Sequence, residues 1–450
     1  MWAGRCAPLA ALDFEPRDWV EHSGWPLTRQ DLDPYYQRAG KLLGLGPEID
    51  QNIWATLGME KPEPWFNPEK LRTQFWQFSR SRNNPKQPAH FGSDYRDFLD
   101  KSKNIRVLLH ANATNLQAVP QGDHVDYIDV KSLNGKQAKI QAKQYVLACG
   151  GIENARLLLA SNSIEETGLG NRHDVVGRYY MEHPRGENGI VMGDDLYLLK
   201  DKLHHYWLDN DTGRHVYLAG VAASDALQKS QSILNCDVSL QVYEDPESGT
   251  RAMERLMHGD SHATSTDIYR VLADLGEVID STQRRLLSQR PPVIRTKKIT
   301  LECHIEQAPN PLSRIRLSDK KDALGSPLAQ MDWQLTQQEH HAIETLSKNI
   351  ATEFGRLKLG RVKLSDWVLD HQQNWKKSVQ DVAHHMGATR MSDTMTKGVV
   401  DKNCKVHNMD NLFIAGSSVF PTSGCVNPTL TIVALAIRIA DTLKNQKKEA

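Results

Sequence analysis

The sequence predicts an α/β chain, α+β overall, with two domains, and three observations lead to that class. A short apolar run at 145–149 is followed by two glycines and a helix-like segment. A second apolar run, at 412–415, leads through a loop rich in Gly, Ser and Pro to an apolar helix. The strand-like runs at 216–221, 233–242 and 299–305 indicate a separate antiparallel sheet. A chain of 450 residues can bury enough surface for two domains.

The first predicted element is a helix near the N-terminus. Thr28 and Asp31 have the spacing of a capping box, and the helix is expected to run toward Leu43. The next predicted element is a short buried strand at 105–109, because four of its five residues are apolar (IRVLL).

Two glycines follow the run at 145–149. The order of strand, Gly150–Gly151 and a helix from 153 to about 160 is typical of a backbone that must approach a ligand closely. Turn glycines alone are a weak signal, since most of them serve only the turn. Cys149, at the end of the run, is expected to be a buried small residue.

The middle of the chain mixes strand-like and helical runs. A polar helical stretch is expected at 265–287, and a further helix at 337–354. We expect the region 196–335 to carry the antiparallel sheet. After it the chain is expected to return to the first domain.

Two polar residues near the C-terminus are the main candidates for chemistry. His384 opens the string HHMGATRM, and Asn427 precedes Pro428 at the start of the apolar helix. A neutral histidine can accept a proton near pH 7, and an amide can hold the same oxygen by a hydrogen bond. The structural alternatives are a core histidine and an asparagine that only caps its helix. His385 is the alternative to His384 as the proton acceptor.

Composition excludes several classes of protein. The formal net charge is +0, so no basic footprint for nucleic acid is present. The six cysteines are scattered without a C-x-x-C, and no carboxylate stands at metal-ligand spacing beside the histidine pair, so no metal is expected. The longest apolar stretch, 430–440, is too short to span a bilayer.

Several strings resemble one known family. His384-x-x-Gly387 is followed by Asn427-Pro428-Thr429-x-Thr431, and AGSSVFPTSG lies between them. These strings resemble the glucose-methanol-choline (GMC) family of FAD-dependent oxidoreductases, most of all the branch that holds pyranose oxidase and the flavoprotein subunits of bacterial sugar and polyol dehydrogenases. The strings WAGRCAPLAALDFEPRDW, YVLACGGIENARLLLAS and VGRYYMEHP also fit this family.

The resemblance implies an activity and its residues. An alcohol group of a sugar, polyol or related small molecule would be oxidised by hydride transfer to flavin N5, with His384 as the base and Asn427 as the hydroxyl partner. The start of the helix at Pro428 would support negative charge on the reduced flavin. The residues implied to bind FAD are Gly4, Ala113, Gly150, Gly151, Gly416, Ser417, Asn427, Pro428 and Thr429.

The resemblance also implies a division of the chain. Residues 1–195 are expected to be part of an incomplete Rossmann-like FAD-binding domain that lacks its G-x-G-x-x-G unit. Residues 196–380 are expected to form mainly the antiparallel-sheet substrate domain, and 381–450 the catalytic segment that returns to the FAD domain. We expect a fragment of a longer protein or a start codon placed too far downstream; the alternative is a non-catalytic, decayed relative that binds no FAD.

The sequence does not identify the electron acceptor. The electron acceptor can be oxygen, a quinone or a cytochrome, so oxidase and dehydrogenase are not distinguished. Nucleic acid and a membrane span are not expected. The chain as given favours the cytoplasm, although a signal lost with the N-terminus would change that.

Overall fold

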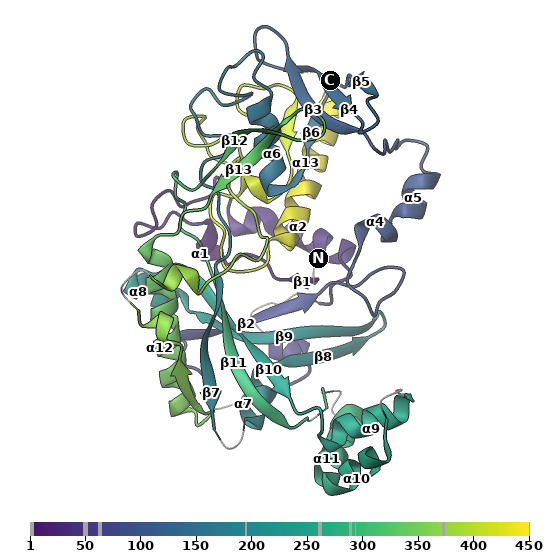
Figure 1. Cartoon of the computed structure of the whole chain (residues 1–450), viewed down its shortest axis with the longest axis vertical. Coiled ribbons are helices and arrows are strands. Elements are labelled where there is room, and N and C mark those ends of the chain that lie inside the picture. Colours follow the sequence, from purple (N-terminus) through teal and green to yellow (C-terminus); the bar gives the residue numbers. More distant parts are fainter. Residues whose placement is uncertain are drawn as a thin grey trace.

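A computed structural model of the chain describes residues 4–47, 53–61, 65–193, 196–259, 263–287, 290–292, 294–370 and 374–449. Their buried apolar side chains form two hydrophobic cores. In Figure 1 one core lies around the yellow C-terminal helix in the upper half, and the other lies on the large sheet in the lower half.

A large sheet dominates the lower half (Figure 1). Within the described residues it has eight strands in the order β1-β2-β9-β10-β11-β7-β14, with β8 paired to β9, and all of its pairs are antiparallel. The strands are β1 (Arg5–Cys6), β2 (Leu71–Phe78), β7 (Arg185–Met192), β8 (His205–Asn210), β9 (Gly213–Ala223), β10 (Cys236–Glu244), β11 (Thr296–Ile305) and β14 (Arg361–Leu364).

The two faces of this sheet differ because side chains alternate along a strand. Val238 and Leu240 of β10 and Leu301 of β11 are buried on the face that contacts helix α12 (Gln337–Arg356). The opposite face carries polar side chains from the same strands. The apolar face is what holds α12 in place.

The upper core is built on smaller sheets. Strand β6 (Tyr145–Leu147) pairs in parallel with β15 (Leu412–Ile414), and two helices, α6 (Gly150–Ala160) and α13 (Thr429–Glu449), follow them in the chain. The remaining strands are β3 (Asn112–Ala118), β4 (Val125–Lys131) and β5 (Gln137–Ile140) in one sheet, and β12 (Arg314–Lys321) and β13 (Pro327–Asp332) in another.

The other helices are mostly short. Near the N-terminus they are α1 (Ala11–Phe14), α2 (Arg29–Leu42), α3 (Ile53–Thr56), α4 (Phe91–Asp94) and α5 (Arg96–Lys101). Later in the chain they are α7 (Tyr197–Lys202), α8 (Asp225–Gln231), α9 (Gly249–His258), α10 (Ser265–Ala273) and α11 (Leu275–Leu287), with 3₁₀ turns at Asp366–Val368, Asn374–Lys377 and Ser417–Val419. Helices α9 to α11 project from the end of the large sheet (Figure 1).

Most of the predicted elements are present. Thr28 caps α2 and forms the expected box with Asp31, and the runs at 216–221 and 299–305 lie inside β9 and β11. The run at 233–242 becomes a strand only from Cys236, which begins β10.

Two predictions were wrong. The segment 105–109 forms no strand, and its apolar side chains are exposed, Leu109 by 76%. The prediction of a buried strand rested on the apolar residues of this segment alone, and apolar residues can also be exposed. Cys149 is exposed rather than buried, since it lies at the N-cap of α6, beyond the last paired residue of β6.

The large sheet joins strands from both sides of the predicted border at residue 195. Its strands β1, β2 and β7 come from within 1–195, and they pair with strands from 196–380. Residues 194–195, at the first border itself, lie outside the described part. The three-part division of the chain therefore stays a proposal.

Candidate active site

Two distant chain segments run side by side at the centre of the site. Met181 and Met386 exchange both backbone hydrogen bonds at 2.9 Å, and Arg185 and Gln380 form a second antiparallel bridge. These two bridges set the register between the segment before β7 and the segment that carries the histidine pair. No feature of the local sequence specifies that register.

This register brings two imidazoles together. The Nδ1 atom of His183 lies 3.0 Å from the Nδ1 atom of His384, with the rings edge to face. The far nitrogen of His183, Nε2, lies 3.4 Å from the carbonyl oxygen of Ser423. His183 and Ser423 are fully buried.

Asn427 reaches the same histidine from the loop that precedes α13. Its Nδ2 atom lies 3.2 Å from Nε2 of His384. Asn427 ends the loop after β15, and Pro428 and Thr429 start α13 behind it. The two residues predicted to be catalytic therefore lie within hydrogen-bonding distance, although they stand 43 positions apart.

A buried carboxyl group holds the backbone of this corner. Oε1 of Glu182 accepts hydrogen bonds from the backbone N–H groups of His384 at 2.6 Å and His183 at 3.0 Å. Ala383 adopts φ +59°, a conformation that costs energy for a residue with a side chain, so it needs such support. Burial raises the pKa of Glu182 to about 7.

The histidines are held neutral. Burial, followed by the positive charge that His183 would carry, lowers the pKa of His384 to about 2. Burial lowers the pKa of His183 to about 3. Near pH 7 both rings therefore carry a single N–H, and one nitrogen of each can accept a hydrogen bond.

His385 points elsewhere. Its ring stacks on Tyr180 with centroids 6.1 Å apart, and its Nε2 lies 3.6 Å from Oε2 of Glu182, beyond hydrogen-bonding distance. Its backbone carbonyl accepts a hydrogen bond of 2.6 Å from Ser417 Oγ. This geometry favours His384 over His385 as the proton acceptor.

Three of the glycines predicted to bind FAD have distinct surroundings. A Cβ on Gly151 would lie 2.2 Å from the carbonyl oxygen of His385, so only glycine lets α6 start against the histidine segment. Gly150 has φ +92° and Gly416 has φ +120°. A Cβ on Gly150 would meet nothing within 4 Å, so the first turn of α6 is open on that side.

The remaining predicted residues lie apart. Gly4 precedes β1 with φ +81°, and a Cβ there would come 2.8 Å from Ser79 Oγ. Ala113 is exposed on β3, opposite Val130. The structure places neither of them against His384 or Asn427. Residues 1–3, which open the WAGRC string, lie outside the described part of the chain.

Sequence reasoning missed the polar face of the large sheet. His304 Nδ1 lies 3.1 Å from Oδ1 of Asp237, and Glu302 Oε2 accepts a hydrogen bond of 2.8 Å from Gln241. Asp237 Oδ2 and Ser239 Oγ are buried and, among the described residues, have no hydrogen-bond partner. The alternation of polar and apolar residues in 236–242 was the available signal.

The polar face lies near His183 and His384, which are called the histidine corner below. The positive charge that His304 would carry contributes to the lowered pKa of both His183 and His384. Buried polar atoms without partners are costly in a folded protein, and a polar ligand or water would satisfy them. Side chains able to bind hydroxyl groups therefore stand close to the candidate base.

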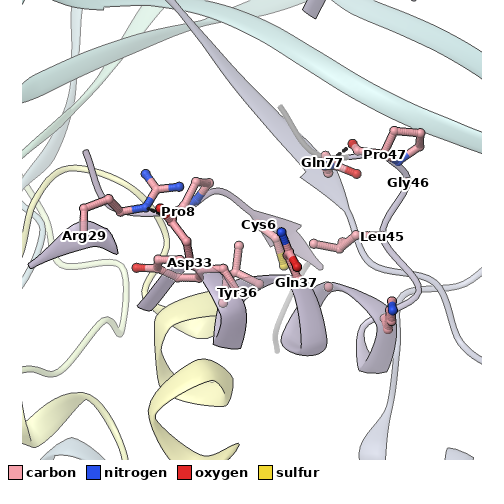
Figure 2. Close-up of a pocket in the computed structure, with 13 residues that line it drawn as sticks. Cys6, Pro8, Arg29, Asp33, Tyr36, Gln37, Leu45, Gly46, Pro47 and Gln77 are labelled. Carbon is pink, nitrogen blue, oxygen red and sulfur yellow. Dashed lines mark hydrogen bonds and ion pairs between the residues drawn. The ribbon is translucent and has the colours of Figure 1, made fainter. Parts of the chain in front are cut away.

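A pocket of about 320 Å³ lies beside the start of α13, and Figure 2 shows side chains that line it. Cys6 of β1, Tyr36 of α2 and Gln77 of β2 line it, together with Leu430 in the first turn of α13. Its lining includes neither His384 nor Asn427. The pocket thus reaches the beginning of α13 from the side of α2.

Comparison with known proteins supports the resemblance seen in the sequence. Residues 309–436 match the GMC oxidoreductase C-terminal model, which covers His384 and Asn427. This part of the chain is similar to the C-terminal part of the GMC oxidoreductases. The proteins that it resembles are FAD-dependent oxidoreductases that act on CH–OH groups. The predicted resemblance and the predicted fold class are confirmed.

Two curated proteins illustrate the relationship. The fructose dehydrogenase large subunit of Gluconobacter japonicus is 26% identical over 314 residues, which are 69% of this chain and 49% of that protein. The 2-methyl-1,2-propanediol dehydrogenase of Mycolicibacterium austroafricanum is 23% identical over 492 residues, covering 98% of this chain and 78% of that protein. The chain therefore spans about half the length of the first of these relatives.

A solved structure shows the same fold. An FAD-dependent oxidoreductase from Chaetomium thermophilum superposes with a TM-score of 0.52 at 14% identity, covering 92% of this chain and 72% of that one. Among the residues that the structure describes, no helix combines the length and the apolar character needed to cross a bilayer.

The site is compatible with the ring end of FAD. The first N–H groups of a helix have no partners inside it and favour negative charge. The starts of both α6 and α13 lie at the histidine corner: Gly151 abuts His385, and Asn427 contacts His384. The open turn at Gly150 leaves room for a group to approach α6.

Proposed function

We propose that the protein oxidises an alcohol group of a sugar, polyol or related small molecule with FAD as cofactor, and that His384 is the base. The observation that carries this proposal is the pairing of His384 Nε2 with Asn427 Nδ2 at 3.2 Å. A hydroxyl group that approaches both side chains from the same side would find a proton acceptor and a hydrogen-bond donor close together.

FAD, when bound, would supply the oxidant that takes the hydrogen of the alcohol carbon together with its electron pair. The chain supplies the rest of the reaction. Nε2 of His384 receives the hydroxyl proton as the O–H bond breaks, and Asn427 holds the same oxygen while the carbonyl product forms. The starts of α13 and α6 would hold the flavin, with Pro428 and Thr429 beside its ring.

The low pKa of His384 fits this role in one respect and constrains it in another. A ring that is neutral near pH 7 always has a free nitrogen to offer. Holding the transferred proton is unfavourable in so dry a corner, unless negative charge enters the site with the ligands and raises that pKa.

The substrate class is supported by the polar face of the sheet. Asp237, Ser239 and Glu302 are acceptors of the kind that bind several hydroxyl groups of one molecule. Two relatives are named for fructose and for a propanediol. A substrate with hydroxyl groups beyond the one oxidised fits this face better than a simple alkanol does.

The test compares two neighbouring histidines in the flavin-loaded protein. His384→Ala should slow the reduction of the flavin by substrate by about 10²–10⁴-fold, the usual scale for loss of a general base. His385→Ala, the matched control, should change that rate by less than about tenfold. Stopped-flow absorbance of the flavin measures both rates.

Two outcomes would contradict the proposal. Larger slowing in His385→Ala would transfer the role to that residue. Equal rates in wild type and His384→Ala would remove the histidine from the chemistry altogether.

A further inference from the structure

A line of hydrogen-bonding contacts runs from a backbone carbonyl to the candidate base. Ser423 O lies 3.4 Å from His183 Nε2, and His183 Nδ1 lies 3.0 Å from His384 Nδ1. Nε2 of His384 then faces Nδ2 of Asn427 at 3.2 Å. His183 and Ser423 are fully buried, so water cannot replace either partner at that end of the line.

The chemistry of each atom determines where the protons lie. A carbonyl oxygen can only accept, so Nε2 of His183 must carry a proton toward Ser423. The buried ring of His183 is neutral, with its pKa lowered to about 3, so its Nδ1 is bare. His384 must then donate from Nδ1, and the Nε2 of its neutral ring is left bare.

The opposite order of protons is unfavourable. A proton on Nδ1 of His183 would leave its Nε2 bare against Ser423 O, so that two acceptors would face each other without water. It would also move the proton of His384 to Nε2. That nitrogen could then donate to a substrate hydroxyl group but could not take its proton.

We propose that His183 is a positioning residue that selects the Nδ1–H tautomer of His384 and leaves Nε2 free to accept a proton. The use of that tautomer in alcohol oxidation rests on the proposed function, whereas the tautomer itself does not. Glu182 supports the same arrangement, because its carboxyl group holds the backbone N–H of both histidines.

The first experiment reads the tautomer without any turnover. Long-range ¹H–¹⁵N correlation spectra of the ¹⁵N-histidine-labelled chain near pH 7 distinguish bare from protonated ring nitrogens. Signals are assigned by their loss in His183→Asn and His384→Gln. We expect His384 to be protonated on Nδ1 and His183 on Nε2; a proton on Nε2 of His384 in the wild-type chain would overturn the proposal.

The second experiment changes the neighbour. His183→Phe keeps a ring but removes the acceptor, so His384 should shift toward the Nε2–H form. His183→Asn offers Oδ1 near the place of Nδ1, so it should keep the wild-type tautomer. His385→Phe is the matched control and should also leave the tautomer unchanged. An unchanged tautomer in a folded His183→Phe would overturn the proposal; if that variant does not fold, the wild-type and His183→Asn spectra decide.

Kinetics connects the tautomer to catalysis. In the flavin-loaded protein, His183→Phe should lower kcat by about 10–100-fold, the scale seen when a partner that orients a functional histidine is lost. KM should change little, and His183→Asn should recover most of the rate. A wild-type rate in His183→Phe with a shifted tautomer would contradict the proposed function while leaving the tautomer assignment standing.

Discussion

The two cores of the molecule are built differently. The lower core lies on a sheet of eight described strands, where Leu301 and its neighbours are fully buried against α12. In the upper core the parallel sheet of β6 and β15 has two described strands, and Val146 in the middle of β6 is 42% exposed. In the lower core, α12 covers the apolar face of the sheet. In the upper core, the apolar side chain of Val146 is partly exposed on β6, and the turn at Gly150 is open.

Different parts of the molecule supply His183 and Asn427 to the site. His183 lies just before β7 of the large sheet, and its ring contacts His384 and the carbonyl oxygen of Ser423. Asn427 enters from the upper core, at the start of α13. The candidate base thus lies between a buried histidine and the loop that starts α13, which suits a site that must hold a proton acceptor rigidly and admit a large cofactor.

The largest expected contrast is in stability. Leu301→Ala removes a fully buried side chain between β10 and β7 and should lower the free energy of unfolding by about 2–5 kcal/mol. Val146→Ala, on the exposed side of β6, should cost less than about 1 kcal/mol. Urea unfolding of both variants measures the difference; equal losses would show that β6 is as well covered as the large sheet.

Within the upper core, alanine substitutions at the two glycines of the α6 turn are expected to lower stability by different amounts. Gly151→Ala places a Cβ against the carbonyl of His385 and should destabilise the fold by about 1–3 kcal/mol, since it overpacks a contact between backbones. Gly150→Ala meets open space and should cost about 1 kcal/mol, because of its positive φ alone. Thermal unfolding separates the two; a larger loss at Gly150 would mean that the turn is not open.

A further expected effect is on the pH dependence of stability. The pKa of His183 is lowered from 6.5 to about 3 on folding, so below pH 6.5 the unfolded chain takes up a proton that the folded chain refuses. This contribution to stability is present above pH 6.5 and is lost as pH falls toward 3, at about 1.4 kcal/mol per pH unit. Urea midpoints between pH 7 and 5 should therefore fall more steeply in wild type than in His183→Asn.

Glu182 also changes the stability with pH, and it does so in both the wild type and His183→Asn. Its pKa is raised from 4.5 to about 7, so its contribution has the opposite sign: stability is lost as pH rises from 4.5 to 7. The contribution of Glu182 remains in both proteins, so the difference between the two curves reports His183 together with its effect on the pKa of His384. Parallel curves would mean that His183 is not held neutral by the fold.

Local patterns in the sequence were enough for much of the fold. The capping box at Thr28, the strand–glycine–helix order at Gly150 and the apolar strands β9 and β11 follow from side-chain chemistry over a few neighbouring residues. The family strings around His384 and Asn427 likewise indicated the two residues that the structure brings together. The run at 105–109 misled, because apolar content does not report burial.

Only the tertiary structure decided what surrounds the candidate base. The bridge between Met181 and Met386 places His183 opposite His384, and the loop after β15 turns Ser423 O toward it. These partners are about 200 and 240 positions away from His183 in the chain. The proton order of the histidines depends on burial and on which atoms meet, and both are set by strand register between segments that carry no local signal for each other.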